Sequence, residues 1–78
     1  MSTRPVQPMP DDVHRELEEH DVFDAYQQRP FYQRNDYLAW IGRAKKIETR
    51  RRRIEQMLAE LERGGIYMAM DHPPSREN

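Results

Sequence analysis

Cysteine is absent from this 78-residue chain, which excludes disulfides, thiolate nucleophiles and cysteine-ligated zinc together. Serine is scarce as well: Ser2 and Ser75 both fall in expected terminal segments, so no serine triad is available. The chain also lacks a glycine-rich phosphate-binding loop. These absences remove the commonest nucleophiles and cofactor motifs. We therefore expect a protein that is not an enzyme and that uses no cofactor.

Long apolar runs are missing too. The longest stretches span only a few residues, and the opening Met-Ser-Thr-Arg-Pro-Val-Gln-Pro lacks the apolar block of a signal peptide. Charged residues make up 35% of the chain, and the mean hydropathy is -1.16. A chain this polar folds only if its few apolar residues are regularly spaced. We expect no membrane segment and a cytoplasmic location, which the lack of cysteine also fits.

Charge is segregated along the chain, although the formal net charge is only -1. Residues 1–28 hold two basic and seven acidic side chains, residues 29–53 hold nine and two, and residues 54–78 hold two and five. An acidic first helix lying beside the basic centre would compensate this charge inside the molecule. A nucleic-acid partner is therefore not needed to explain the basic segment.

The apolar spacing predicts three main helices. The first covers about residues 11–20, with Asp11 or Asp12 as its N-cap, and a short helical turn near residues 21–28 follows it. The second covers about residues 32–46, and the third about residues 48–63, where Gly64 and Gly65 supply the stop. The residues expected to face inward in these segments are Val13, Leu17, Val22, Phe23, Tyr26, Tyr37, Leu38, Trp40, Ile41, Ala44, Ile54, Met57, Leu58 and Leu61.

Neither proline nor glycine separates the last two predicted helices, so one continuous helix has to be considered. At 100° per residue, the centres of their two apolar arcs differ by about 130°. A single straight helix could not bury both arcs on one surface. We therefore place a break near Lys46 and Ile47.

The fold class that follows is all-α: a small three-helix bundle with a short extra helical turn and flexible termini. Residues 1–10, with three prolines, are expected to form a flexible lead-in, and residues 11–65 the helical domain. Residues 66–78 form a tail that is partly packed or disordered. Its apolar stretch, residues 66–70, is too short to assign by periodicity, so its packing stays open.

Residues 37–57 begin Tyr-Leu-Ala-Trp-Ile-Gly-Arg-Ala-Lys and continue through Glu-Thr-Arg. This segment resembles the C-terminal helical segment of the YdeI/OmpD-associated (OmdA-like, bacteriocin-protection) family, whose pattern is Tyr-x-x-Trp-Ile-x-x-Ala-Lys-x-x-Glu-Thr-Arg-x-Arg-Arg-Ile. The sequence matches every named position from Tyr37 to Ile54, but has Ile47 where the family commonly has proline. The resemblance implies a bacterial, cytoplasmic helical domain linked to peptide or stress protection. It brings no catalytic residues.

The basic run at residues 50–53, with Arg43, Lys45 and Lys46 just upstream, is the most suggestive feature. One interpretation is that the guanidinium groups bind phosphates of a nucleic acid or another polyanion. The other is that Arg50, which falls inside the apolar arc, pairs with an acidic residue of the first helix while the other arginines are solvated. We favour the second, because consecutive helical positions point about 100° apart and form no flat patch.

Two further groups bear on function. Trp40 lies at the edge of its apolar arc, so we expect its side chain to be more exposed than that of Tyr37. Of the two, Trp40 is the better candidate for contact with another molecule. His14, Glu18 and His20 share one acidic helix, but the second histidine points away from the other two residues, so we expect no metal site. The candidate partner or anion contacts are Trp40, Lys45, Arg50, Arg51, Arg52 and Arg53.

The leading functional hypothesis is a non-enzymatic accessory or interaction module whose partner is a protein. The alternative is a small helix-turn-helix-like nucleic-acid or polyanion binder that uses the run at residues 50–53, since a basic helix follows a short turn. The acidity of the whole chain weighs against the alternative. The oligomeric state stays open.

Overall fold

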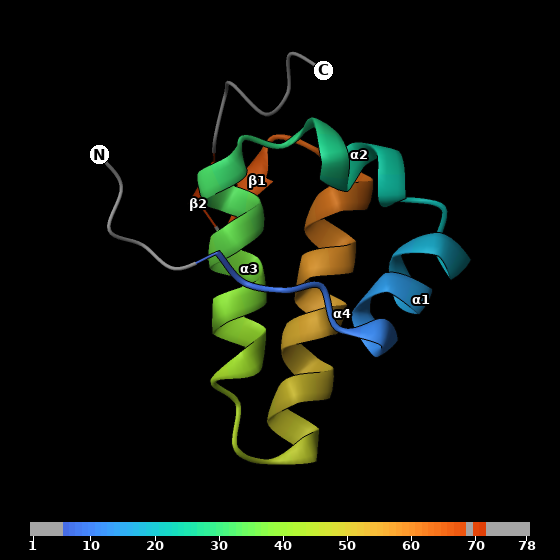
Figure 1. Cartoon of the computed structure of the whole chain (residues 1–78). Helices are drawn as coiled ribbons and strands as arrows, with labels where there is room; N and C mark the ends of the chain where they lie inside the picture. Colours follow the sequence, from blue (N-terminus) through green and yellow to red (C-terminus); the bar gives the residue numbers. More distant parts are fainter. Residues whose placement is uncertain (1–5, 69, 72–78) are drawn as a thin grey trace.

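The computed structural model describes residues 6–68, 70 and 71. In this part of the chain, four helices are followed by two short strands (Figure 1). The helices are α1 (Asp11–Glu19), α2 (Phe23–Gln28), α3 (Phe31–Gly42) and α4 (Ile47–Arg63), and the strands are β1 (Ile66–Tyr67) and β2 (Met70–Asp71). Three helices and an extra helical turn were expected, and α2 is that turn. The all-α class is confirmed.

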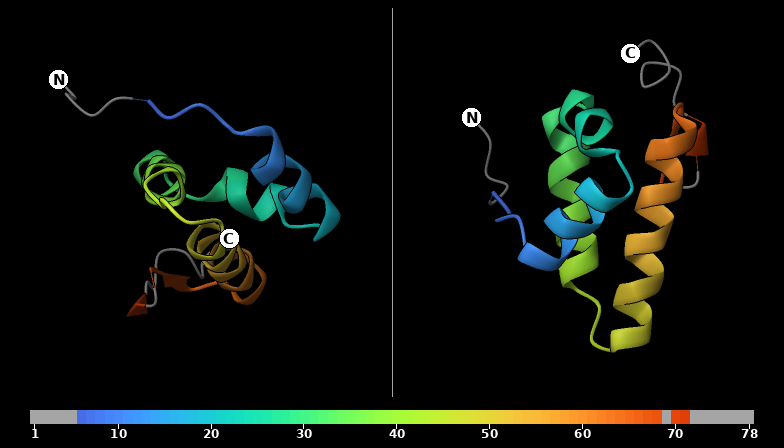
Figure 2. Two further views of the ribbon diagram at one scale, coloured as in Figure 1. Left: turned by 90° about the horizontal axis from the view of Figure 1, so that it is seen from below. Right: turned by 90° about the vertical axis from the view of Figure 1, so that its right-hand side faces the viewer.

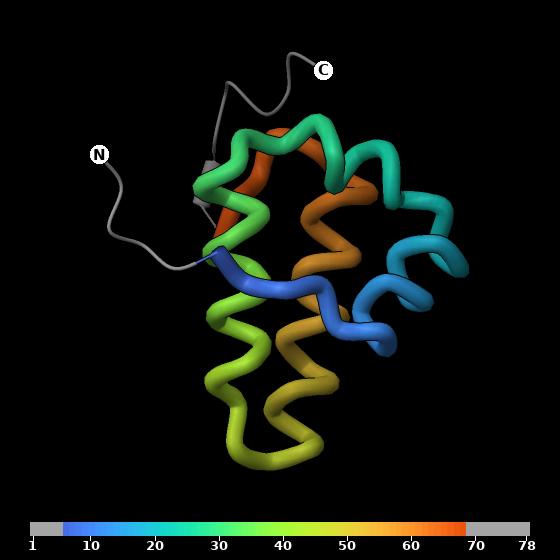
Figure 3. Tube along the Cα trace, in the orientation of Figure 1, coloured from blue at the N-terminus to red at the C-terminus, as the bar shows by residue number. Residues whose placement is uncertain are grey.

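The helices α3 and α4 lie side by side as an antiparallel pair, joined by a turn at one end (Figures 1 and 2). The short helices α1 and α2 also pack on α4, so α4 contacts every other helix. The tube in Figure 3 shows residues 6–10 running across α3 before α1 begins. Each helix therefore buries the apolar stripe that its sequence spacing predicts.

The core consists of the predicted inward faces. Val13 and Leu17 of α1 are fully buried, as are Tyr37 and Ile41 of α3 and Met57 of α4. The cluster is completed by Val22, Tyr26, Leu38, Ile54, Leu58, Leu61 and Tyr67, with Phe23 and Trp40 partly buried at its edge. Since the side chains of Tyr37 and Ile41 lie one turn apart, they share the face of α3 that meets α4.

The predicted N-cap of the first helix is wrong. Pro10 occupies the cap position, no side chain caps the helix, and Asp11 and Asp12 lie inside its first turn. The fixed backbone of proline suits a helix start. The carboxylate of Asp12 accepts a hydrogen bond from the amide of Val13 (2.9 Å) and is otherwise turned toward α4. The two acidic side chains still lie at the positive end of the helix dipole.

The break between the last two helices is confirmed at the predicted place. Lys46 is extended (φ -105°, ψ 147°) and caps α4, which begins at Ile47. The helix before it ends at Gly42, four residues earlier than predicted, so Ala44 lies in the turn rather than in α3. Gly42 itself favours this earlier end, since glycine is a poor helix former. At the far end of α4, Gly64 has φ 75°, the left-handed region that glycine adopts without strain.

A buried polar cluster around Glu60 was not predicted. The carboxylate accepts hydrogen bonds from the hydroxyl of Tyr37, the amide of Met68 (2.9 Å) and the side chain of Gln56 (3.0 Å). The buried guanidinium of Arg29 donates to the backbone carbonyl of Glu60 (3.1 Å) and to the side chain of Gln33 (3.2 Å). Burial raises the pKa of Tyr37 well above its usual value, and the hydrogen bond to Glu60 adds to this, so the hydroxyl stays a donor.

The chain after α4 folds back on the bundle. Ile66 pairs with Asp71 and Tyr67 with Met70 in a two-residue antiparallel ladder, which the sequence did not predict. The buried ring of Tyr67 meets Tyr37 edge-on (5.5 Å between centroids), and its hydroxyl donates to Asp36 (2.8 Å). Residues 66 and 67 therefore pack. Of the predicted flexible lead-in, residues 1–10, and the predicted tail, residues 66–78, the residues 1–5, 69 and 72–78 lie outside the described residues.

Among the described residues, no helix is long and apolar enough to cross a membrane.

The buried cluster yields a stability prediction. We expect Tyr37→Phe to lower the free energy of unfolding by about 1–3 kcal/mol, because it removes one donor from a buried carboxylate. Urea denaturation measures the change, and Arg52→Gln, at an exposed position of α4, is the control with almost no effect. Equal stability of Tyr37→Phe and the wild type would show that the Glu60 carboxylate does not need this donor.

Candidate functional site

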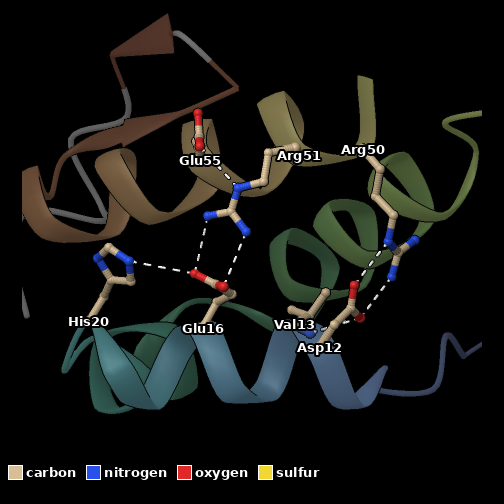
Figure 4. Close-up of polar contacts among 7 residues, drawn as sticks. All are labelled: Asp12, Val13, Glu16, His20, Arg50, Arg51 and Glu55. Atoms are coloured by element: carbon tan, nitrogen blue, oxygen red, sulfur yellow. Dashed lines mark hydrogen bonds and ion pairs between the residues drawn. The ribbon is translucent and has the colours of Figure 1, made fainter. Parts of the chain in front are cut away.

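Arg50 makes the contact that was predicted for it. Its Nε and Nη2 atoms donate to the two carboxylate oxygens of Asp12 in α1, at 3.1 and 2.9 Å (Figure 4). This forked geometry is the strongest form of an arginine–carboxylate pair. The hydrogen bonds from Arg50 hold the pKa of Asp12 below its usual value. Because the Asp12 side chain is still 49% exposed, solvent weakens the pair.

Arg51 was expected to be solvated, and its side chain is 46% exposed, but it also has partners that were not predicted. Its guanidinium donates to both oxygens of Glu16 in α1 (3.1 and 3.2 Å), while its Nε donates to Glu55 one turn along α4 (3.0 Å) (Figure 4). Glu16 also lies 3.5 Å from the Nε2 atom of His20. The hydrogen bonds from Arg51 lower the pKa of Glu16. Two adjacent arginines of α4 thus reach carboxylates one turn apart on α1. We call the contacts of Arg50 and Arg51 with Asp12, Glu16 and Glu55 the ion-pair ladder.

Arg53 contacts α3 rather than solvent. Its guanidinium lies over the ring of Trp40, 5.2 Å from the centroid, and its Nη1 atom donates to the carbonyl oxygen of Trp40 (2.6 Å). That carbonyl belongs to the last turn of α3, where backbone oxygens have no partner inside the helix. The contact therefore satisfies a helix end and covers part of an aromatic face. Trp40 is half-buried, more exposed than Tyr37, as predicted.

The remaining basic residues point to solvent. Arg43, Lys45, Lys46 and Arg52 are exposed, and within the part of the chain that the structure describes none of them has an ion-pair partner. Ile47 projects among them with 84% of its surface exposed. We call this set the turn surface; it consists of Arg43, Lys45, Lys46, Ile47 and Arg52. It occupies the turn between α3 and α4 and the start of α4, the lower end of the molecule in Figure 1.

The histidines lie in different surroundings. The Nε2 atom of His14 is 3.7 Å from Glu18, while His20 lies 3.5 Å from both Glu16 and Glu62. The two imidazoles therefore do not converge on one point. In residues 6–68, 70 and 71, no group of three or more histidine, aspartate or glutamate side chains is arranged to hold a metal ion.

Sequence reasoning predicted an acidic partner for Arg50 on the first helix without naming the residue, and it missed the partners of Arg51 and Arg53. The opposite net charges of residues 1–28 and 29–53 predict that the first helix faces the basic segment. They do not tell which carboxylate meets which arginine. That pairing depends on where α1 crosses α4, which only the folded structure shows.

Comparison with known proteins finds one match. A family model described as "OmdA: Bacteriocin-protection, YdeI or OmpD-Associated" matches residues 8–64. The match runs from the residues before α1 to the glycine that ends α4, so it includes all four helices. No curated protein and no solved structure matches significantly.

The ion-pair ladder predicts unequal roles for neighbouring arginines. We expect Arg50→Gln and Arg51→Gln each to lower the free energy of unfolding by about 0.5–1 kcal/mol, since their partners are partly exposed. Arg52→Gln, which removes the same charge from a solvated position, should be nearly neutral. Chemical denaturation of the three variants at low salt measures how much unfolding free energy each one loses. A loss for Arg52→Gln as large as that for Arg51→Gln would contradict this assignment.

The ladder also predicts a pH dependence. The folded pKa values of Asp12 and Glu16 lie below the ordinary values of 3.8 and 4.5, so the ionised carboxylates stabilise the fold above those values. This stabilisation is lost as the pH falls through the lowered folded pKa values. The stability difference between wild type and Arg51→Gln should therefore be full near pH 6 and smaller at about pH 3, below the ordinary pKa of Glu16. Urea denaturation at both pH values tests this; a difference that persists undiminished in acid would show that Arg51 acts by other means.

Proposed function

The chain belongs to the OmdA family of bacteriocin-protection, YdeI or OmpD-associated proteins, and from this membership we propose that it is a non-enzymatic helical module that acts by binding another protein. As part of the same proposal, it works in the bacterial cytoplasm in peptide or stress protection. The proposal rests on the turn surface, the part of the basic segment that the fold itself does not use.

The fold divides the family pattern into two groups. Tyr37, Ile41 and Ile54 pack in the core, while Arg50 and Arg53 hold α4 against α1 and α3. These residues have a structural reason to be present. Lys45 and Arg52 belong to the same pattern, yet they are exposed and make no ion pair within the described residues. Their positions are explained by a contact outside the chain, and this observation carries the proposal.

The chemistry of the turn surface favours a protein partner. The exposed side chain of Ile47 offers an apolar contact, and three exposed basic side chains precede it closely in the chain, at residues 43, 45 and 46. An apolar centre with a charged rim is the usual composition of a protein interface. We therefore propose an acidic protein surface with an apolar recess as the partner. Electrostatic attraction would speed its association.

The alternative, a helix-turn-helix-like nucleic-acid or polyanion binder, has less support. Three of the four arginines at residues 50–53 are engaged in contacts with carboxylates or with Trp40. In addition, α3 and α4 run side by side (Figure 2), whereas the helices of a DNA-binding helix-turn-helix cross steeply. Few phosphate contacts would remain, and phosphate contacts supply most of the affinity for nucleic acids.

A charge-reversal experiment tests the proposal. Lys45→Glu/Arg52→Glu should lose the proteins that co-purify with the tagged wild-type chain from a bacterial lysate treated with nuclease, because a repulsive rim prevents docking. Arg15→Glu/Arg63→Glu makes the same change of charge at exposed positions away from the turn, and should keep them. Circular dichroism checks that both variants fold.

The same variants distinguish the alternative. If binding is to a polyanion, the wild type should be retained on heparin with a steep salt dependence, and Lys45→Glu/Arg52→Glu should lose that retention. That result, or an identical set of co-purified proteins for both double variants, would sink the protein-binding proposal.

A further inference from the structure

A second surface, separate from the turn surface, forms a groove of about 320 Å³. Its walls come from α1, α2, α3 and the residues before α1, which cross α3 in Figure 3. The helix α4 does not contribute to it. The floor and sides are largely apolar, and the apolar and aromatic residues that line it include Met9, Phe23, Tyr26, Phe31 and Leu38.

The groove is held open by contacts of its own walls. The backbone amide of Gln7 donates to the side-chain oxygen of Asn35 (2.7 Å), which fixes the crossing segment to α3. On the other side, Phe23 lies edge-on to His14 (5.1 Å) and is stacked on Tyr26 (6.3 Å). All of these contacts are made between the walls of the groove themselves. A ligand would therefore enter a largely preformed site, which reduces the entropy lost on binding.

The groove contains one buried polar group without a hydrogen-bond partner among the described residues, the hydroxyl of Tyr26. Tyr26 is only 4% exposed. Yet no fully enclosed side-chain oxygen or nitrogen in that part of the chain lacks a partner. The hydroxyl must therefore reach open space, and the groove is the open space that Tyr26 lines. Burial raises the pKa of Tyr26, so the hydroxyl is protonated at neutral pH and can donate a hydrogen bond.

Arg34 supplies a charge at the same place. Its Nε atom donates to the backbone carbonyl of Arg29 (3.0 Å), and its guanidinium lies over the ring of Phe31, 5.7 Å from the centroid. Both contacts orient the guanidinium, and among the described residues its two terminal nitrogens have no hydrogen-bond acceptor. Tyr26 and Arg34 line the same groove. Within the described part of the chain, no acidic side chain lines the groove, although the chain as a whole is slightly acidic.

We propose that this groove binds a small carboxylate with an apolar body about the size of one aromatic ring. The body would lie against Phe23 and Leu38, while the carboxylate accepts hydrogen bonds from the guanidinium of Arg34 and the hydroxyl of Tyr26. The guanidinium of Arg34 and the neutral hydroxyl of Tyr26 match a carboxylate, which has one negative charge and two oxygens. A phosphate has more oxygens and more charge, and would need more donors and more positive charge. The volume lies at the lower end of ligand pockets, so the ligand is small.

This site does not depend on the proposed protein interaction, because the groove and the turn surface share no residue.

The binding test uses the full chain and two matched probes. Heteronuclear NMR spectra are recorded during titration with 3-phenylpropionate and with the neutral 3-phenylpropanamide. We expect saturable shifts confined to residues 6–9, 14 and 23–38 for the carboxylate. The amide should bind at least about tenfold more weakly, since it lacks the charge-assisted hydrogen bond.

Variants then assign the two polar groups. Tyr26→Phe keeps the ring and should weaken binding of 3-phenylpropionate about threefold to tenfold without lowering the melting temperature, because among the described residues the hydroxyl has no hydrogen-bond partner to lose. Arg34→Gln should weaken it about tenfold or more. Arg43→Gln, at the other end of α3, is the control that should bind as the wild type does.

Three results would overturn the proposal: no saturable shifts at millimolar probe, shifts centred on the turn surface, or full affinity in Tyr26→Phe. If Arg34→Gln does not fold, Tyr26→Phe alone decides. If the groove does not bind 3-phenylpropionate, the co-purification experiment on the turn surface is unaffected. The two proposals are therefore tested separately.

Discussion

The buried carboxylate of Glu60 ties together parts of the chain that are far apart in sequence. It accepts hydrogen bonds from the hydroxyl of Tyr37 in α3 and from the amide of Met68 after α4. The backbone carbonyl of Glu60 accepts a third hydrogen bond, from Arg29 at the end of α2. A carboxylate in a core this small is tolerable only if every acceptor position is satisfied and a cation is close. The packing of α2, α3 and the final hairpin on α4 therefore follows from this one group. The apolar contacts alone would allow several arrangements of such short helices.

On the surface, the basic segment has two uses that follow from its position on α4. The face turned toward α1 and α3 uses its arginines for interhelical contacts, in which Arg50 and Arg51 bind carboxylates and Arg53 covers Trp40. The turn before α4 and the outward face of α4 have no helix opposite them, so Lys45, Lys46 and Arg52 stay in solvent. The fold thus divides one run of basic residues into arginines that contact other helices and basic side chains that stay in solvent.

The groove and the turn surface lie in separate parts of the same small domain. The groove is formed where short segments meet, because α1, α2 and the crossing residues 6–9 cannot fill the space beside α3 completely. The turn surface is formed where the long helix pair extends beyond α1 and α2 (Figure 1). The family match starts at residue 8, so it includes part of the segment that walls the groove.

The sequence by itself determined the helices, the inward faces and the break at Lys46, because apolar periodicity acts locally and the two arcs could not share one surface. It also indicated that the acidic first helix lies beside the basic segment. Only the tertiary structure decided that Arg29, Gln33, Asn35 and Glu60 are buried, since a polar side chain enters a core only when partners from other elements meet it there. The same holds for Arg51, Arg53 and the hydroxyl of Tyr26. Their surroundings depend on where separate helices cross, and spacing along one helix contains no information about that crossing.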